Sequence, residues 1–144
     1  MLIGQYTSKL TDKDRLAIPK KLREELGEEL IITRWYENCL VIIAKAGWEA
    51  LFARLTGNSV LITSPVRDID RFVLGNAFEV VLDSQGRFVL PEILSTFAQI
   101  EDEVVFVGLL DRVEIWSLEQ WKAQETLAQD KANKAIEEIA QVSK

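Results

Sequence analysis

The chain carries one ten-residue pattern twice, 72 positions apart. Residues 10–19 read LTDKDRLAIP and residues 82–91 read LDSQGRFVLP, so a leucine, an arginine and a proline recur in register. Apolar residues stand between the arginine and the proline in both copies. Self-similarity at a fixed period indicates a duplicated supersecondary unit. The chain is therefore expected to fold as two equivalent units that share a core.

The flanks of the two copies follow the same order of elements: a short helix, an acidic turn, an apolar strand, a polar turn, a second strand and a tryptophan that begins a helix. Short apolar runs rich in Val, Ile and Phe and bounded by turns are typical of buried strands. The pattern predicts strands near 2–10, 15–18, 30–35, 39–44, 77–82, 87–90, 104–109 and 113–116. Helices are predicted at about 19–26, 48–55, 68–74 and 91–97.

These elements predict a mostly β chain with short helices, an α+β fold in four parts. The first repeat spans residues 1–58, a connecting helical segment 59–76, the second repeat 77–122 and a C-terminal helical tail 123–144. Ser117 is predicted to cap the last helix, with Gln120 completing a capping box.

The C-terminal tail has a seam of its own. Small or apolar residues fall at Ala128, Ala132, Ala135, Ile139 and Val142, in alternating steps of four and three that are typical of a coiled coil. Two interpretations stay open. The tail is either a surface helix packed lightly on its own domain or a contact between subunits.

Composition argues against several classes of protein. The 144 residues contain no histidine, which excludes nucleophile schemes with a histidine base and zinc sites with histidine ligands. Glycine-rich phosphate loops and paired cysteines are absent too. The acidic residues at 24, 25, 28 and 29 have the spacing of a solvated helix face. Neither an enzyme, nor a cofactor, nor a metal site, nor a small-molecule substrate is predicted.

The single cysteine and the apolar runs bear on location. Cys39 cannot form a disulfide within the chain, and it lies in an apolar run as a small buried hydrophobe would. The apolar run 104–110 is far shorter than the eighteen or so residues of a membrane-spanning helix. The expected location is the cytoplasm, without a membrane partner.

Charge is distributed unequally between the two repeats. The net charge is −6, yet residues 1–23 hold six basic and two acidic residues, a net charge of +4, whereas residues 72–112 hold two basic and seven acidic residues, a net charge of −5. Phosphate contacts dominate nucleic-acid affinity, so the distribution matters more than the sum. The candidate DNA-binding residues form one basic edge: Lys13, Arg15, Lys20, Lys21 and Arg23.

The recurring arginine has two possible roles. A planar guanidinium with five donors suits either a structural pairing across a turn or a phosphate or guanine edge. In the second repeat Asp83 invites the structural pairing with Arg87, and the two roles stay open there. At Arg15 the basic neighbours favour nucleic-acid contact.

The repeated turn resembles the bacterial MraZ family. Leu82-Asp83-Ser84-Gln85-Gly86-Arg87, followed by Pro91, matches the family pattern, as do Gly4, Arg71 with Leu74-Gly75-Asn76-Ala77, and Val107-Gly108 with Glu114-Ile115-Trp116. The resemblance covers nearly the whole chain. It implies two AbrB/SpoVT-type repeats that form a swapped-hairpin β-barrel and assemble into a homo-oligomeric ring.

The same resemblance implies a function. It implies a nucleoid-associated transcriptional regulator that binds double-stranded DNA at short repeated boxes upstream of the division and cell-wall gene cluster, including its own gene. DNA contact is carried over to Lys13 and Arg15, and secondarily to Arg87.

The first copy of the motif departs from the family pattern. Thr11 stands in place of Asp, and Asp14 in place of Gly. Asp tolerates a positive φ better than most residues, so the turn is expected to survive. The Asp14 carboxylate is expected either to pair with Arg15 or to repel a phosphate. These departures keep open a second function, that of an AbrB-like protein-interaction module without DNA binding.

Overall fold

Short apolar runs and tight polar turns build two antiparallel sheets in the computed structural model, which describes residues 1–142. The elements of the first repeat and the connection are β1 (Ile3–Lys9), β2 (Arg15–Ala17), α1 (Lys20–Leu26), β3 (Glu29–Arg34), η1 (Tyr36–Asn38), β4 (Leu40–Ala44), η2 (Lys45–Gly47), α2 (Trp48–Leu55), α3 (Ser64–Val73) and η3 (Leu74–Asn76). Those of the second repeat and tail are β5 (Phe78–Val81), β6 (Arg87–Val89), α4 (Glu92–Phe97), β7 (Glu103–Leu109), β8 (Val113–Ser117) and α5 (Leu118–Val142).

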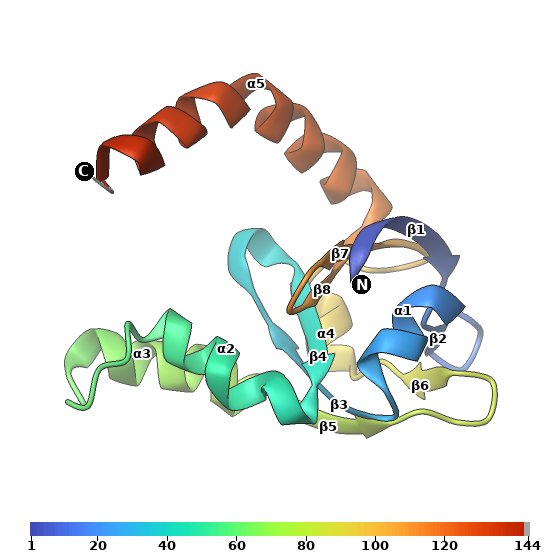
Figure 1. Cartoon of the computed structure of the whole chain (residues 1–144). Helices are drawn as coiled ribbons and strands as arrows, with labels where there is room; N and C mark the ends of the chain where they lie inside the picture. Colours follow the sequence, from blue (N-terminus) through green and yellow to red (C-terminus); the bar gives the residue numbers. More distant parts are fainter. Residues whose placement is uncertain (143–144) are drawn as a thin grey trace.

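The two repeats exchange strands. The larger sheet has six strands in the order β1-β7-β8-β4-β3-β5, so the first strand of each repeat pairs with the third strand of the other. β2 and β6, one from each repeat, form a separate two-stranded ribbon. Figure 1 places this ribbon beside α1, at one end of the larger sheet. Neither repeat has a complete sheet of its own.

A pseudo-twofold axis relates the repeats. In the ribbon Leu16 lies directly opposite Phe88, and the two residues hold the same position in their repeats. In the larger sheet Val41 lies opposite Glu114, the equivalent pair of β4 and β8. The duplicated sequence is thus folded around one shared centre.

Apolar side chains fill the space between the ribbon and one face of the larger sheet. The ribbon contributes Leu16 and Phe88, which are almost fully buried, and α1 and α4 contribute Leu22 and Leu94. A second cluster covers the opposite face of the sheet, where Leu51 of α2 and Trp121 of α5 pack. Strands buried on both faces explain why their sequences are apolar throughout rather than alternating.

Two helical arms leave this core. α2 and α3 form one arm and α5 the other (Figure 1). The Ser117 hydroxyl accepts a hydrogen bond from the backbone N–H of Gln120 at 3.2 Å, which confirms Ser117 as the cap of α5. Within residues 1–142, no helix has both the length and the apolar character needed to span a membrane.

Most predicted elements lie within two residues of the observed ones, and the α+β class is confirmed. The connecting helix is an exception, because α3 begins at Ser64 rather than at residue 68. Pro65 occupies its first turn, where proline needs no hydrogen-bond donor. The closed barrel is not confirmed, since the six-stranded sheet is open, with β1 and β5 as its edges. Residues 143–144 of the predicted tail lie outside the described part.

Candidate nucleic-acid interface

The outer face of the ribbon carries both repeated arginines. Successive side chains of a strand point to opposite faces. Leu16 and Phe88 are buried, so the residues before and after each of them point away from the core. Arg15 lies opposite Val89 and Arg87 lies opposite Ala17 in the register. The fold therefore brings the arginines of the two repeats onto one half-exposed surface.

The turns before β2 and β6 have the same backbone geometry. In the first, the N–H of Thr11 donates to the carbonyl of Arg15 at 2.9 Å and the N–H of Asp14 donates to the carbonyl of Thr11 at 3.0 Å. Asp83, Gly86 and Arg87 repeat these two bonds at 3.0 Å each. Both turns need a positive φ at their last residue, 56° at Asp14 and 75° at Gly86. The prediction that Asp14 preserves the turn is confirmed.

In the second turn a carboxylate holds the arginine. Asp83 Oδ2 accepts a hydrogen bond from Arg87 Nε at 3.0 Å, and its Oδ1 accepts from the backbone N–H groups of Arg87 and Gln85 at 2.9 Å. The bond from the Arg87 backbone N–H contributes most to lowering the pKa of Asp83. Arg87 thus has the structural pairing that its sequence neighbour suggested.

In the first turn the equivalent arginine has no such partner. Thr11 replaces the aspartate, and among residues 1–142 no ion pair is formed by Arg15, Asp14 or Lys13. Of the two alternatives for the Asp14 carboxylate, the pairing with Arg15 is therefore not observed. Lys13 is exposed at the tip of the turn and Arg15 is half-exposed beside it. Both cations are available to a ligand on the outer face.

The cations of α1 lie beside the second turn. Lys20 and Arg23 line a hollow of about 300 Å³ together with the carboxylates of Glu24, Glu28 and Asp83 and with Ser84 and Gly86 of the turn. The Arg23 guanidinium covers Gly86 so closely that a Cβ on that glycine would overlap it. The two repeats therefore contribute to one edge, with Lys20 and Arg23 of the first repeat at the turn of the second.

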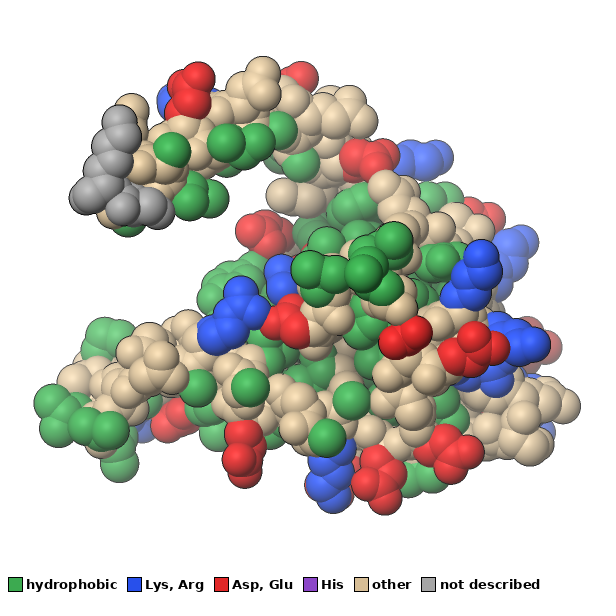
Figure 2. All heavy atoms as spheres, viewed as in Figure 1, with side chains coloured by type: hydrophobic (Ala, Val, Ile, Leu, Met, Phe, Trp, Pro, Cys, Tyr) green, Lys and Arg blue, Asp and Glu red, His purple; other side chains and the backbone are tan. Residues whose placement is uncertain are grey.

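Basic side chains gather towards one end of the molecule. Lys21 is exposed on α1 and adds to this edge. Figure 2 shows Lys and Arg side chains towards the right-hand end, over the region of α1 and the ribbon, with Asp and Glu side chains between them. The edge combines cations from both strands of a ribbon and from the adjacent helix.

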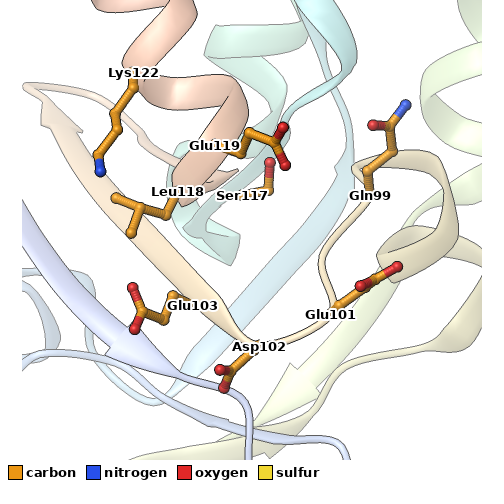
Figure 3. A pocket seen from close by; sticks show the side chains of 8 residues that line it. All are labelled: Gln99, Glu101, Asp102, Glu103, Ser117, Leu118, Glu119 and Lys122. Atoms are coloured by element: carbon orange, nitrogen blue, oxygen red, sulfur yellow. The ribbon is translucent and has the colours of Figure 1, made fainter.

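A hollow at the base of α5 is more strongly acidic. Its volume is about 550 Å³, and Glu101, Asp102, Glu103 and Glu119 line it, with Lys122 as its basic residue (Figure 3). In Figure 3 the acidic side chains of the segment before β7 lie across the hollow from the first turn of α5. Such a surface repels phosphate, so a nucleic acid is expected to bind at the ribbon instead.

The single cysteine lies just before β4, outside the ribbon. Cys39 is fully buried, and burial raises the pKa of its thiol. It is the small buried hydrophobe that the sequence predicts. Among residues 1–142, no group of three or more Cys, Asp or Glu side chains is arranged to hold a metal ion.

Comparison with known proteins places this chain in a family. The family described as "MraZ protein, putative antitoxin-like" matches residues 1–72 and again residues 73–142. The chain belongs to the MraZ family. Transcriptional regulator MraZ of Thermoanaerobacter sp. (strain X514) is 41% identical over 122 residues, 85% of each chain. The protein of the same name from Caldicellulosiruptor saccharolyticus is 37% identical over 142 residues, 96% of this chain and 99% of the relative.

Membership of the MraZ family bears on two of the sequence predictions. The resemblance inferred from the repeated turn is confirmed, as is the duplication. The relatives carry the name of a transcriptional regulator, which is not an enzyme class.

The place of α1 in this MraZ chain does not follow from the local sequence. Adjacency in sequence predicts that Lys20 and Arg23 lie near the first turn, whereas strand exchange places them at the second. Gly86 is buried although it lies in a polar turn. One sequence signal points to this packing. The second copy has Gly86 at the position where the first copy has Asp14, and a glycine leaves room for a side chain over the turn.

The Asp83–Arg87 pairing in the MraZ turn predicts a pH dependence. A carboxyl with a lowered folded pKa stabilises the fold above its unfolded value of 3.8, and this contribution disappears as the pH falls through the folded pKa. Asp83→Asn is therefore expected to be less stable than the wild type at pH 7, with the difference narrowing below about pH 4. Urea unfolding at several pH values measures this, with Asp12→Asn controlling for the loss of one turn carboxylate. A difference in the free energy of unfolding between Asp83→Asn and the wild type that stays constant down to pH 2 would contradict a stabilising role for the ionised Asp83 carboxylate.

Proposed function

We propose that this chain is a sequence-specific DNA-binding transcriptional regulator. The observation that carries the proposal is the two-stranded ribbon whose outer face bears Arg15 and Arg87, with Lys13 and the cations of α1 beside it. A two-stranded β-ribbon fits the major groove of B-DNA, and an arginine fork pairs with the edge of guanine. The names of the relatives in the MraZ family support the same function.

The two arginines have different roles in this proposal. Arg15, which forms no ion pair within residues 1–142, contacts DNA directly. Arg87 is oriented by Asp83, so its contact is secondary. Lys13, Lys20, Lys21 and Arg23 supply phosphate contacts, which set the register of the ribbon on the duplex.

Assembly compensates for the weak binding expected of one acidic subunit. One chain offers few cations, so binding to a single box is expected to be weak and salt-sensitive. A ring of several chains on tandem boxes makes later contacts intramolecular, which multiplies affinity by roughly 10²–10⁴. Exposed apolar residues in the α2–α3 connection support such assembly, because Val60 is 93% and Ile62 is 74% exposed in the single chain.

The proposal extends to target, location and fold. The expected targets are repeated boxes upstream of the division and cell-wall gene cluster, including the gene for this chain, and the expected site of action is the nucleoid in the cytoplasm. The ribbon and the larger sheet are taken as two sides of one swapped-hairpin barrel, because they share an apolar core.

The experiment is a mobility shift with DNA from upstream of the gene, carrying one box or tandem boxes, at two salt concentrations. Tandem boxes are expected to bind at least tenfold more tightly than one box, and the affinity is expected to fall as salt rises. Light scattering on the same preparation measures the size of the assembly. No shift at low salt by an assembled protein would favour the alternative.

That alternative is an AbrB-like protein-interaction module without DNA binding. The Asp14 carboxylate, exposed in the basic turn, and the net charge of −6 favour it. The two functions predict different effects of removing this carboxylate.

Asp14→Asn is expected to strengthen DNA binding by roughly twofold to tenfold, because removing a negative charge next to Arg15 and Lys13 removes repulsion of phosphate. Asparagine also tolerates the positive φ of this position, so the turn is retained. Asp14→Gly is the matched variant with full backbone freedom and is expected to bind as tightly. Fluorescence anisotropy measures both, and unchanged affinity in Asp14→Asn would contradict direct DNA contact at this turn.

A further inference from the structure

We propose that the outer half of α5 is a contact surface for a second copy of the same helix, packed antiparallel. α5 is anchored at its base, where the rings of Trp121 and Trp116 lie 5.6 Å apart and Trp121 Nε1 donates a hydrogen bond to Gln5 at 3.1 Å. From Thr126 to Val142 every residue is exposed. This half of the helix therefore has an apolar face that no other element of residues 1–142 covers.

The apolar face of the outer half lies on the same side of the helix as Trp121, which packs on the core, with Gln124 and Glu125 between them. At 100° per residue Ala128, Ala132, Ala135, Ile139 and Val142 lie within about 40° of one line, and Trp121 lies on the same line. Ile139 is 67% and Val142 is 86% exposed. Figure 2 shows hydrophobic side chains along one side of α5, facing open space. The same side of the helix thus packs on the core at its base, where Trp121 is half-buried, and is exposed beyond it.

Side-chain sizes favour an antiparallel partner. In an antiparallel pair the alternating positions of the seam face each other, so Ala132 of one chain lies against Ala135 of the other. In the same register Ile139 lies against Ala128 on both sides of the twofold axis. A large residue opposite a small one fills the space evenly, and the central alanines allow a close approach of the two helices.

The charges beside the seam select the same register. Lys131 and Glu138 are the flanking residues on one side of the stripe, and an antiparallel pair places Lys131 of each chain beside Glu138 of the other. A parallel pair would instead place Lys131 beside Ile136. Two opposite-charge contacts form only in the antiparallel arrangement, and they identify the occupant as a second copy of this chain.

An isologous contact of this kind joins chains in pairs and closes on itself, so it is additional to the contacts between neighbours in the proposed ring. It is separate from the ribbon, because it uses no residue of β2, β6 or α1. It therefore goes beyond DNA binding, and its failure and the failure of the DNA-binding proposal are distinguishable.

Cysteine cross-linking of the full chain tests the pairing. In Ala128→Cys/Ile139→Cys, oxidation is expected to give a disulfide-linked dimer in which Cys at 128 of one chain is joined to Cys at 139 of the other. The two positions lie about 16 Å apart along one helix, too far for a disulfide within a chain. Lysines at 131 and 134 let protease digestion separate the two sites for mass spectrometry. Cys39 is buried and does not compete.

Two further variants make the test specific. Lys131→Glu in the cysteine background is expected to lower the yield of dimer at least threefold, and adding Glu138→Lys is expected to restore it. Glu137→Cys, on the opposite side of the helix, is the control for random collision. Links of 128 to 128 or 139 to 139 would overturn the antiparallel register. A yield no higher than that of the control would overturn the contact and favour another occupant, such as the α2–α3 connection of a second copy.

Discussion

Arg15→Ala is expected to lower the affinity for tandem-box DNA by at least tenfold, and Arg87→Ala by much less. A base-contacting arginine contributes roughly 1–3 kcal/mol to specific binding. In an assembled protein the loss recurs at every engaged subunit, so the observed effect exceeds that of one contact. Arg87 is held by Asp83, whereas Arg15 has no ion pair among residues 1–142, and this difference underlies the unequal expectation.

The measurement is a titration of fluorescent duplex DNA at constant salt. Arg15→Lys is the conservative control, because it keeps the charge but loses the planar fork, and we expect it to retain binding with weaker discrimination between box and scrambled DNA. Thermal unfolding should differ little between the Arg15 variants and the wild type, since Arg15 forms no ion pair in the described part of the chain. Equal losses in the Arg15 and Arg87 variants would refute the assignment of different roles.

Gly108→Ala is expected to have the largest effect on stability. Gly108 of β7 lies opposite Gly4 of β1. A Cβ on Gly108 would stand 2.5 Å from the backbone nitrogen of Ile3 and 2.7 Å from the carbonyl carbon of Leu2. Backbone atoms cannot rotate away as a side-chain end can, so β1 would have to move off β7. We expect the free energy of unfolding to fall by roughly 2–4 kcal/mol.

Urea unfolding measures this loss, and Gly75→Ala is the matched control. A Cβ on Gly75 meets no atom within 4 Å, so its effect should stay within about 0.5 kcal/mol. Because β1 belongs to the first repeat and β7 to the second, the comparison also tests strand exchange. A Gly108 variant as stable as the Gly75 variant would mean that β1 does not pack on β7 as described.

The sequence predicts where the strands and helices lie better than it predicts which strands pair. Period and turn chemistry locate all eight strands, since the run 104–109 and the turn at Gly86 are local signals. They do not say that β1 pairs with β7 rather than with a strand of its own repeat, because a duplicated pattern is compatible with both arrangements. The observed register of β1 on β7, with Ile3 opposite Leu109, decides between the two arrangements.

At the candidate site, too, the sequence predicts local features but not long-range ones. The pairing of Asp83 with Arg87 and the positive φ of Asp14 follow from residue types four or fewer positions apart. The packing of Arg23 over Gly86 joins residues 63 positions apart and depends on the strand exchange. Long-range placement of charged side chains is thus what the sequence alone does not determine.

The central claim is that the turn before β2 touches DNA, and site-specific photo-cross-linking tests it most directly. A photoreactive phenylalanine derivative is placed at Lys13 in one protein and at Lys134, an exposed lysine on α5, in another. After irradiation with tandem-box duplex, we predict a covalent protein–DNA adduct at position 13 and little or none at position 134. An adduct at position 134 equal to that at 13, or none at 13 while the duplex is bound, would contradict the account.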